Sequence, residues 1–212
     1  MKITRRKHQR KAIWFKAGAC FITAILTIGA VYFYTSQNSN APQSTPKVAQ
    51  TASKESTPKF AELSETPARL KIGKINVDAP IIPVGLTKDG DMDAPNNVTD
   101  VGWYNKSAKA GEGKYSVLLD GHRGVNERAV FERLNEVAVG DTISLITSQG
   151  TILSYIVRET ETRPYQEVDM KKALLPYKKG AQSMTIITCE GTYSNTKKTY
   201  DNRTVVYAER VK

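Results

Sequence analysis

The feature that most constrains the fold is a series of short runs rich in β-branched and aromatic residues, each bounded by turn-forming residues. Six runs stand out: RLKIGKI (69–75), SVLLD (116–120), DTISLIT (141–147), TILSYIVRE (151–159), TIITC (185–189) and RTVVYAE (203–209). Runs of this length and composition predict strands, and the short glycine-containing link at 148–150 predicts a hairpin. Helical signals are brief, at 128–137 and at 169–175, where Asp169 is a candidate N-cap. We therefore predict a mainly β domain, a closed or nearly closed barrel with one or two short helices.

The basic charge of the chain is concentrated at its N-terminus. The formal net charge is +10, but seven lysines and arginines lie in residues 1–16 and no acidic residue precedes Glu55. Without those seven residues, 24 basic side chains remain against 21 acidic ones, a net charge of +3. A nearly neutral body with one basic end indicates membrane topology and not a phosphate-binding surface, so we expect no nucleic-acid partner.

An uncharged stretch, AGACFITAILTIGAVYFY, follows the basic end at residues 17–34. As a helix it would rise about 27 Å, close to the hydrocarbon thickness of a bilayer. Aromatic residues flank it at Trp14 and Tyr34, as is typical of the membrane interfaces. We predict a single-pass anchor in the plasma membrane, with residues 1–16 as a cytoplasmic basic tail. A cleaved signal peptide is the alternative, and it would also place the rest of the chain outside the cell.

The composition changes again after the uncharged stretch. Residues 35–67 are rich in Ser, Thr, Pro, Gln, Asn and Ala and contain few large apolar side chains. Such a segment cannot bury enough apolar surface to offset its ordering entropy, so we interpret it as a flexible stalk. The extracellular folded domain is predicted to span residues 68–212.

The chain has two cysteines, Cys20 and Cys189. Cys20 lies in the predicted membrane segment, where we expect a structural or lipid-facing role and no disulfide with Cys189. Cys189 ends an apolar run in an exported domain, where an unpaired thiol calls for an explanation. Two interpretations stay open from this residue alone: a small buried hydrophobe and a thiol nucleophile.

A thiol nucleophile needs a residue that exchanges protons with it. The chain has two histidines, and His8 lies in the predicted cytoplasmic tail. His122 follows the apolar run SVLLD and Gly121, and its imidazole can accept a thiol proton or protonate a departing amine. One histidine with one cysteine does not supply the ligands of a zinc site, so we expect no metal.

Acyl transfer also needs a donor that stabilises the negative charge on the carbonyl oxygen. Arg203 begins the run RTVVYAE that follows TIITC. If these two strands pair in antiparallel fashion, Arg203 lies beside Cys189 and presents a guanidinium that stays protonated. Taken alone, Arg203 is better interpreted as a surface charge, because surface arginines are the norm.

Together these motifs resemble the sortases, which are membrane-anchored cysteine transpeptidases. The resemblance rests on His122 in a Gly-His turn, on Cys189 closing a T-[LI]-x-T-C strand and on Arg203 opening the next strand. It spans residues 70–211 and includes VGWY (101–104), the segment 121–141 and the terminal VVYAE. VGWY and VVYAE look most like classes D, E and F, of which we prefer class F. The sequence departs from the usual pattern at Ile186, where Leu is commoner, and at Asp120, where small neutral residues are frequent.

The resemblance implies an eight-stranded sortase barrel and a role for each residue. Cys189 would attack the Thr–Gly carbonyl of an LPXTG-like sorting signal and form a thioacyl enzyme. His122 would protonate the departing amine and deprotonate the incoming one, while Arg203 would orient the substrate and stabilise the oxyanion. Thr188 would help to shape the substrate pocket. The implied partners are sorting-signal proteins and an amine acceptor on a peptidoglycan precursor or a pilin, and no cofactor is implied.

Other functions give different expectations. Papain-like proteases place Cys before His, the reverse of the order here, and L,D-transpeptidases carry a histidine- and glycine-rich motif around Cys that this chain lacks. A thiol peptidase without transfer activity and a non-catalytic binding module on a stalk stay open as alternatives. The segment 88–100 resembles the start of a calcium loop, but Ala94 and Asp100 stand where Gly and Glu are required, so we expect a plain turn.

Overall fold

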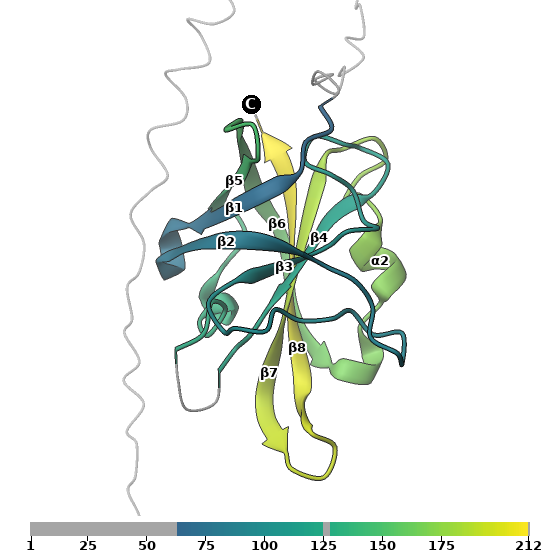
Figure 1. Cartoon of the computed structure of the whole chain (residues 1–212). Coiled ribbons are helices and arrows are strands. Elements are labelled where there is room, and N and C mark those ends of the chain that lie inside the picture. Colours follow the sequence, from purple (N-terminus) through teal and green to yellow (C-terminus); the bar gives the residue numbers. More distant parts are fainter. Residues whose placement is uncertain (1–62, 125–127, 212) are drawn as a thin grey trace, which may run out of the picture. The chain divides into compact units, whose positions relative to one another are not determined.

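The computed structural model describes residues 63–124 and 128–211, and these form a closed barrel of eight strands (Figure 1). The strands are β1 (Pro67–Ile72), β2 (Val77–Val84), β3 (Val101–Tyr104), β4 (Ser116–Gly121), β5 (Thr142–Thr147), β6 (Ile152–Pro164), β7 (Ser183–Ser194) and β8 (Thr199–Val211). Around the barrel they follow the order β1-β2-β3-β4-β7-β8-β6-β5, and β5 closes the ring against β1. The prediction of a mainly β, closed eight-stranded barrel is confirmed.

Each of the six predicted runs overlaps a strand, although the last three residues of the run 69–75 form the 3₁₀ turn η1 (Gly73–Ile75). The predicted hairpin joins β5 to β6, which pair antiparallel. Two further strands, β2 and β3, were not predicted. In β2 the prolines Pro80 and Pro83 interrupt the pattern, because proline removes a ladder donor and normally argues against a strand. In β3 only four residues are extended, and one of them is Gly102.

The two predicted helices have different outcomes. The helix α2 (Met170–Leu174) forms as predicted, and the Asp169 carboxylate accepts a hydrogen bond from the Lys172 backbone N–H at 3.0 Å. The helix predicted at 128–137 is wrong, since only the 3₁₀ turn η2 (Leu134–Glu136) forms there. The Phe131 N–H donates to the carbonyl of His122, and the Val130 N–H donates to that of Val98. These tertiary bonds replace the bonds that a helix would have needed.

The remaining short elements are η1 (Gly73–Ile75) and η3 (Tyr165–Glu167). Within the described residues no helix is long and apolar enough to cross a bilayer. The predicted tail, the anchor at 17–34 and the stalk up to residue 62 lie outside the described residues. Contacts with the barrel begin before its first strand, because Glu65 forms an isolated bridge with Ala110.

The core fills the interior of the barrel with side chains from alternate strand positions. Fully buried residues include Leu70, Ile143, Leu145, Leu153 and Ile186. Each such side chain contributes about 1.5–3 kcal/mol through removal from water. This packing fixes the positions of β4, which His122 follows, and of β7, which contains Cys189.

Candidate active site

Strands β4 and β7 lie side by side and run parallel, so their C-terminal ends point the same way. Their register pairs Asp120 with Ile187 and Gly121 with Thr188. His122 directly follows β4, and Cys189 is the next residue of β7, which places both at the same end of the barrel. The sequence-predicted pair is therefore brought together by the register of two parallel strands.

Thr188 joins the two strands at their last register pair. Its hydroxyl donates to the Gly121 carbonyl at 2.8 Å, and the side chain is buried. Because side chains alternate along a strand, Thr188 and Cys189 face opposite sides of β7. This hydrogen bond therefore fixes the backbone immediately before His122 and immediately before Cys189.

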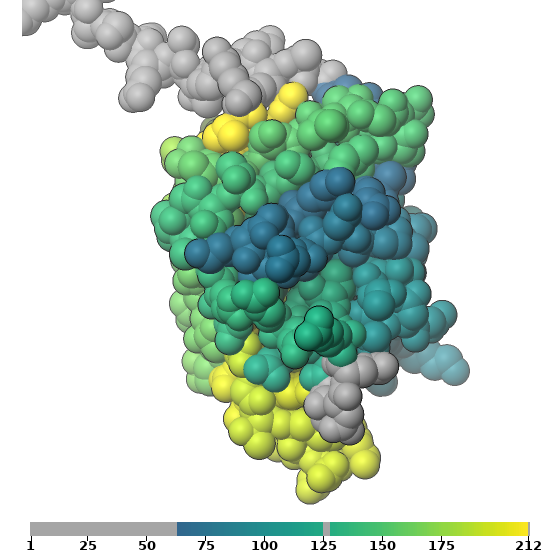
Figure 2. Space-filling model, turned by 90° about the vertical axis from the view of Figure 1, so that its left-hand side faces the viewer, coloured from purple at the N-terminus to yellow at the C-terminus, as the bar shows by residue number. Residues whose placement is uncertain are grey.

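Strands β7 and β8 are antiparallel, and their register places Cys189 directly opposite Arg203. Both strands are longer than the sequence runs indicate, so the two residues lie inside strands and not at strand ends. The register shifts between Glu190 and Tyr193, and Gly191 has a φ of 86° in this irregular segment. In Figures 1 and 2 the yellow ends of β7 and β8 project beyond the other strands.

The imidazole of His122 is held by the backbone of a neighbouring loop. Its Nε2 atom lies 2.8 Å from the carbonyl oxygen of Pro95. A carbonyl can only accept a hydrogen bond, so Nε2 carries the proton and Nδ1 is the nitrogen that can accept one. The backbone carbonyl of His122 accepts from the Phe131 N–H at 2.9 Å, which fixes the loop itself.

The thiol of Cys189 is unpaired and partly buried. Burial raises its pKa, and the carboxylate of Asp120 raises it further, while the guanidinium groups of Arg203 and Arg123 act in the opposite direction. The net direction is upward, so at neutral pH the resting thiol is largely protonated. A neighbouring base is therefore needed to form the thiolate, which is the nucleophilic form.

The guanidinium of Arg203 lies along the first part of β8. Its Nη1 atom donates to the carbonyls of Tyr200 at 3.2 Å and Asn202 at 2.9 Å, and Nη2 donates to the hydroxyl of Thr199 at 2.9 Å. Its Cζ atom also lies 5.5 Å from the ring centroid of Tyr165 in η3. These contacts occupy three of the five N–H groups of the guanidinium.

Asp120 lies near the site and was noted in the sequence only as a departure from a pattern. Its Oδ1 atom is buried without a hydrogen-bond partner. A Cβ atom on Gly102 would collide with that oxygen, so the glycine leaves the room that the carboxyl group needs. Burial, with a smaller contribution from Asp93, raises the pKa of Asp120 to about 7.

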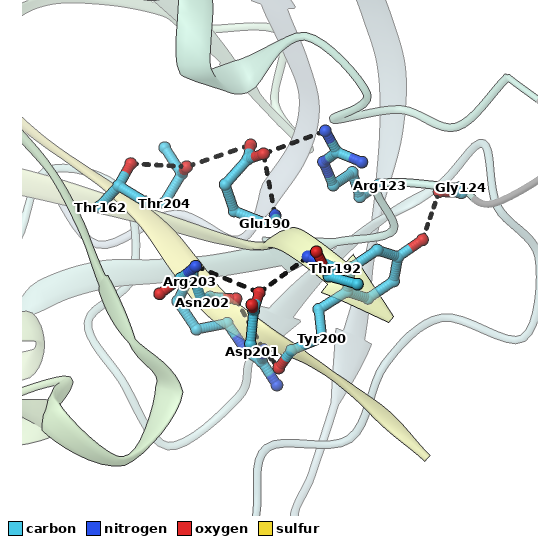
Figure 3. Close-up of polar contacts among 11 residues, drawn as sticks. Arg123, Gly124, Thr162, Glu190, Thr192, Tyr200, Asp201, Asn202, Arg203 and Thr204 are labelled. Atoms are coloured by element: carbon cyan, nitrogen blue, oxygen red, sulfur yellow. Dashed lines mark hydrogen bonds and ion pairs between the residues drawn. The ribbon is translucent and has the colours of Figure 1, made fainter. Parts of the chain in front are cut away.

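Arg123 and Glu190 were not identified from the sequence. Figure 3 shows their side chains meeting between the loop that follows β4 and strand β7, with Nη2 of Arg123 3.0 Å from Oε1 of Glu190. No sequence signal pairs two charged residues so far apart in the chain. Their positions directly after His122 and Cys189 are the one hint that the sequence contained.

The segment 88–100, which resembles the start of a calcium loop in sequence, begins with a turn. In this turn the Gly90 N–H donates to the Thr87 carbonyl at 3.1 Å and the Thr87 N–H to the Asp91 carbonyl at 2.8 Å. Among residues 63–124 and 128–211, no three His, Cys, Asp or Glu side chains gather closely enough to hold a metal ion.

Comparison with known proteins identifies the fold. A family model described as the Sortase domain matches residues 70–211. Sortase C-1 from Actinomyces oris is 26% identical, with a TM-score of 0.53 over 68% of this chain and 73% of that one. A lid mutant of sortase A from Corynebacterium diphtheriae is 23% identical, with a TM-score of 0.53 over 69% and 70% of the two chains.

Sortase C from Streptococcus pneumoniae is 20% identical, with a TM-score of 0.52 over 71% of this chain and 70% of that one. The sortase A lid mutant and sortase C from Streptococcus pneumoniae are both under 25% identical to this chain, so they support the fold alone. A search of curated proteins found no match. The family model covers most of the barrel and both strands that carry His122 and Cys189. The chain therefore belongs to the sortase family.

Proposed function

We propose that this protein is a membrane-anchored cysteine transpeptidase that cleaves an LPXTG-like sorting signal and transfers the cleaved protein to an amine. The observation that carries the proposal is the convergence of His122, Cys189 and Arg203 through two strand registers. The β4–β7 register brings the histidine and the cysteine to the same end of the barrel, and the β7–β8 register places the arginine opposite the cysteine.

The first half-reaction forms a thioacyl enzyme. His122 accepts the thiol proton, and the Sγ atom of Cys189 attacks the carbonyl carbon of the scissile Thr–Gly bond. The carbonyl oxygen becomes an oxyanion in the tetrahedral intermediate, where Arg203 supplies positive charge and N–H donors. When the intermediate collapses, the C–N bond breaks and His122 returns its proton to the departing amine.

The second half-reaction consumes the thioacyl group. The incoming amine attacks the thioester carbon, His122 takes the proton that the amine loses, and the C–S bond breaks to release Cys189. The Nδ1 atom of His122 suits both steps, because the Nε2 proton is committed to the Pro95 carbonyl. The acceptor is an amine on a peptidoglycan precursor or a pilin, which distinguishes a transpeptidase from a thiol peptidase.

The resting contacts of Arg203 specify how it meets the substrate. Three of its N–H groups already donate to Tyr200, Asn202 and Thr199. A substrate oxygen is bound either by the remaining N–H groups or in exchange for one of these bonds. Thr188 acts through the Gly121 carbonyl and fixes the backbone from which His122 and Cys189 project.

The location follows from the same proposal. A single-pass anchor at 17–34 and the stalk that follows it would hold the barrel outside the plasma membrane, where exported substrates and lipid-linked acceptors meet. Class F stays our prediction from VGWY and VVYAE. Cell-surface proteolysis tests the topology, since protease added to intact cells should release the barrel by cutting within the stalk.

The activity is tested by incubating the protein with a library of LPXTG-like peptides, with and without glycine-type and lysine-type amines, and identifying the products by mass spectrometry. We expect a ligated product whose yield rises with amine concentration. Hydrolysis of the peptide with no ligated product at any amine concentration would identify a thiol peptidase. Binding without cleavage would identify a non-catalytic module.

A further inference from the structure

The two candidate catalytic residues are each followed by one member of an ion pair. Arg123 follows His122, and Glu190 follows Cys189. The Nη2 and Oε1 atoms of the pair are 3.0 Å apart, and the side chains are only 28% and 14% exposed. Charged side chains at such low exposure interact more strongly than the fully exposed pairs of a protein surface.

The pair lies where the backbone pairing of β4 and β7 has ended. The last register pair is Gly121 with Thr188, and the Thr188 hydroxyl adds one more link to the Gly121 carbonyl. Beyond that point, the register gives no further pairing between the two strands. The Arg123–Glu190 contact therefore continues the connection between β4 and β7 one residue past the candidate catalytic pair.

Each member of the pair is held by further contacts (Figure 3). The Arg123 guanidinium lies 5.8 Å from the ring centroid of Tyr200, a buried residue of β8. The Tyr200 hydroxyl donates to the Gly124 carbonyl at 2.8 Å, so β8 holds the loop that carries Arg123 at a second point. A ring that contacts both the guanidinium and the loop backbone limits the movement of the loop.

Glu190 is fixed from the opposite side. Its Oε1 atom accepts from the Gly191 N–H at 3.0 Å, and Oε2 lies 3.5 Å from the Thr204 hydroxyl. Thr204 in turn lies 3.1 Å from the Thr162 hydroxyl on β6. The carboxylate is therefore connected to three strands of the barrel, β6, β7 and β8.

We propose that Arg123 and Glu190 are positioning residues, an ion pair that holds the loop bearing His122 in register with the strand bearing Cys189. This inference rests on the proposed function, because the pair acts by keeping the imidazole within reach of the thiol. Proton transfer and nucleophilic attack are sensitive to small displacements of the reacting groups. Neither residue contacts the substrate in this role.

A second ion pair in the barrel provides a matched control. Arg158 and Glu209 are 2.8 Å apart at 36% and 13% exposure, nearly the same geometry and burial. Glu209 pairs with Ser183 at the start of β7, six residues before Cys189, and its Oε2 atom also lies 3.7 Å from Nζ of Lys178. Variants of this pair report what the loss of a similar contact does to the fold alone.

The test uses the full chain, purified with detergent, and the variants Arg123→Ala, Glu190→Gln and their combination, beside Arg158→Ala and Glu209→Gln. We expect kcat for peptide cleavage to fall by roughly 10- to 100-fold in both site variants, with KM changed by less than about threefold. The double variant should lose no more than the worse single variant, since either change removes the same contact. The control variants should keep the wild-type kcat.

A second measurement does not depend on activity. The Phe131 amide donates to the His122 carbonyl, so its hydrogen-exchange rate reports whether the loop is docked. Losing this partly buried ion pair should speed this exchange by roughly tenfold in the site variants and leave it unchanged in the controls. Glu190→Gln keeps the shape of the side chain and serves as the test if Arg123→Ala does not fold.

The two measurements separate the inference from the function on which it rests. If the wild-type protein cleaves no peptide, the proposed function fails. Whether or not the protein is active, an unchanged exchange rate of the Phe131 amide in the site variants would overturn the role of the ion pair. If the protein is active, additive losses in the double variant, or equal losses of kcat in the site and control variants, would overturn the inference.

Discussion

The buried carboxyl group of Asp120 predicts an unusual dependence of stability on pH. Its Oδ1 atom has no hydrogen-bond partner, and burial raises its pKa from 3.8 to about 7. In the folded state the group therefore keeps its proton up to near-neutral pH, whereas in the unfolded chain it ionises near pH 4. Between these values the folded protein binds more protons, so its free energy of unfolding falls as pH rises.

The size of the effect follows from the shift. Each unit is worth 1.36 kcal/mol, so a shift of about three units corresponds to at most about 4 kcal/mol, lost progressively between about pH 4 and pH 7. The variant Asp120→Asn resembles the protonated carboxyl in shape and cannot ionise. We expect it to match the wild type near pH 4 and to be more stable at pH 8 by up to about 4 kcal/mol.

The assay is urea unfolding of residues 63–212, followed by circular dichroism between pH 4 and pH 9. Asp78→Asn is the control, because Arg69, followed by Lys71, lowers the pKa of Asp78 through hydrogen bonds. Stability from a lowered carboxyl pKa is lost only as pH falls below about 4, so this change should not alter the slope of the wild-type curve between pH 4 and pH 9. If the free energies of unfolding of the wild type and Asp120→Asn changed with pH in parallel, Asp120 would not have a raised pKa in the folded protein.

Three further predictions concern the chemistry of the site. A thiol-specific alkylator should modify Cys189 in the native protein at a rate that rises with pH, and reaction only after denaturation would identify a buried spectator. Above about pH 7, where Asp120 is ionised and raises the pKa of the thiol, Asp120→Asn should speed this reaction. His122→Ala should nearly abolish acylation while peptide binding, measured by calorimetry, is retained, and unchanged turnover would exclude this histidine as the proton carrier. Arg203→Lys keeps the charge but loses the planar fork of the guanidinium. We expect turnover to fall by ~100-fold, about 3 kcal/mol, with an unchanged circular dichroism spectrum. Turnover at the wild-type rate would show that Arg203 is only a surface charge.

The sequence predicted the fold class because six of the eight strands have clear apolar patterns. It missed β2, whose two prolines are tolerated inside a barrel strand, and β3, which is too short to show a period. It also placed a helix at 128–137, where the Phe131 amide bonds to His122 and not to the preceding turn. Local pattern cannot reveal such tertiary bonds.

The sequence predicted one of the two strand pairings that form the candidate site. Pairing of Cys189 with Arg203 followed from one assumption, that successive strands pair in antiparallel fashion, and the register confirms it. The parallel pairing that brings His122 beside Cys189 was not predicted from the residues, because it joins strands that are distant in the chain. The Arg123–Glu190 contact and the buried state of Asp120 depend on the same long-range packing, so no local sequence pattern indicates them.

The central claim is that Cys189 forms a covalent acyl intermediate with a sorting peptide. The most direct measurement is intact-protein mass spectrometry after rapid mixing with an LPXTG-like peptide in the absence of an amine acceptor, followed by peptide mapping. We expect a mass increase equal to the acyl half of the peptide, located on Cys189, discharged by added amine and absent in Cys189→Ala. An adduct on another residue, or amine ligation by Cys189→Ala, would contradict this claim.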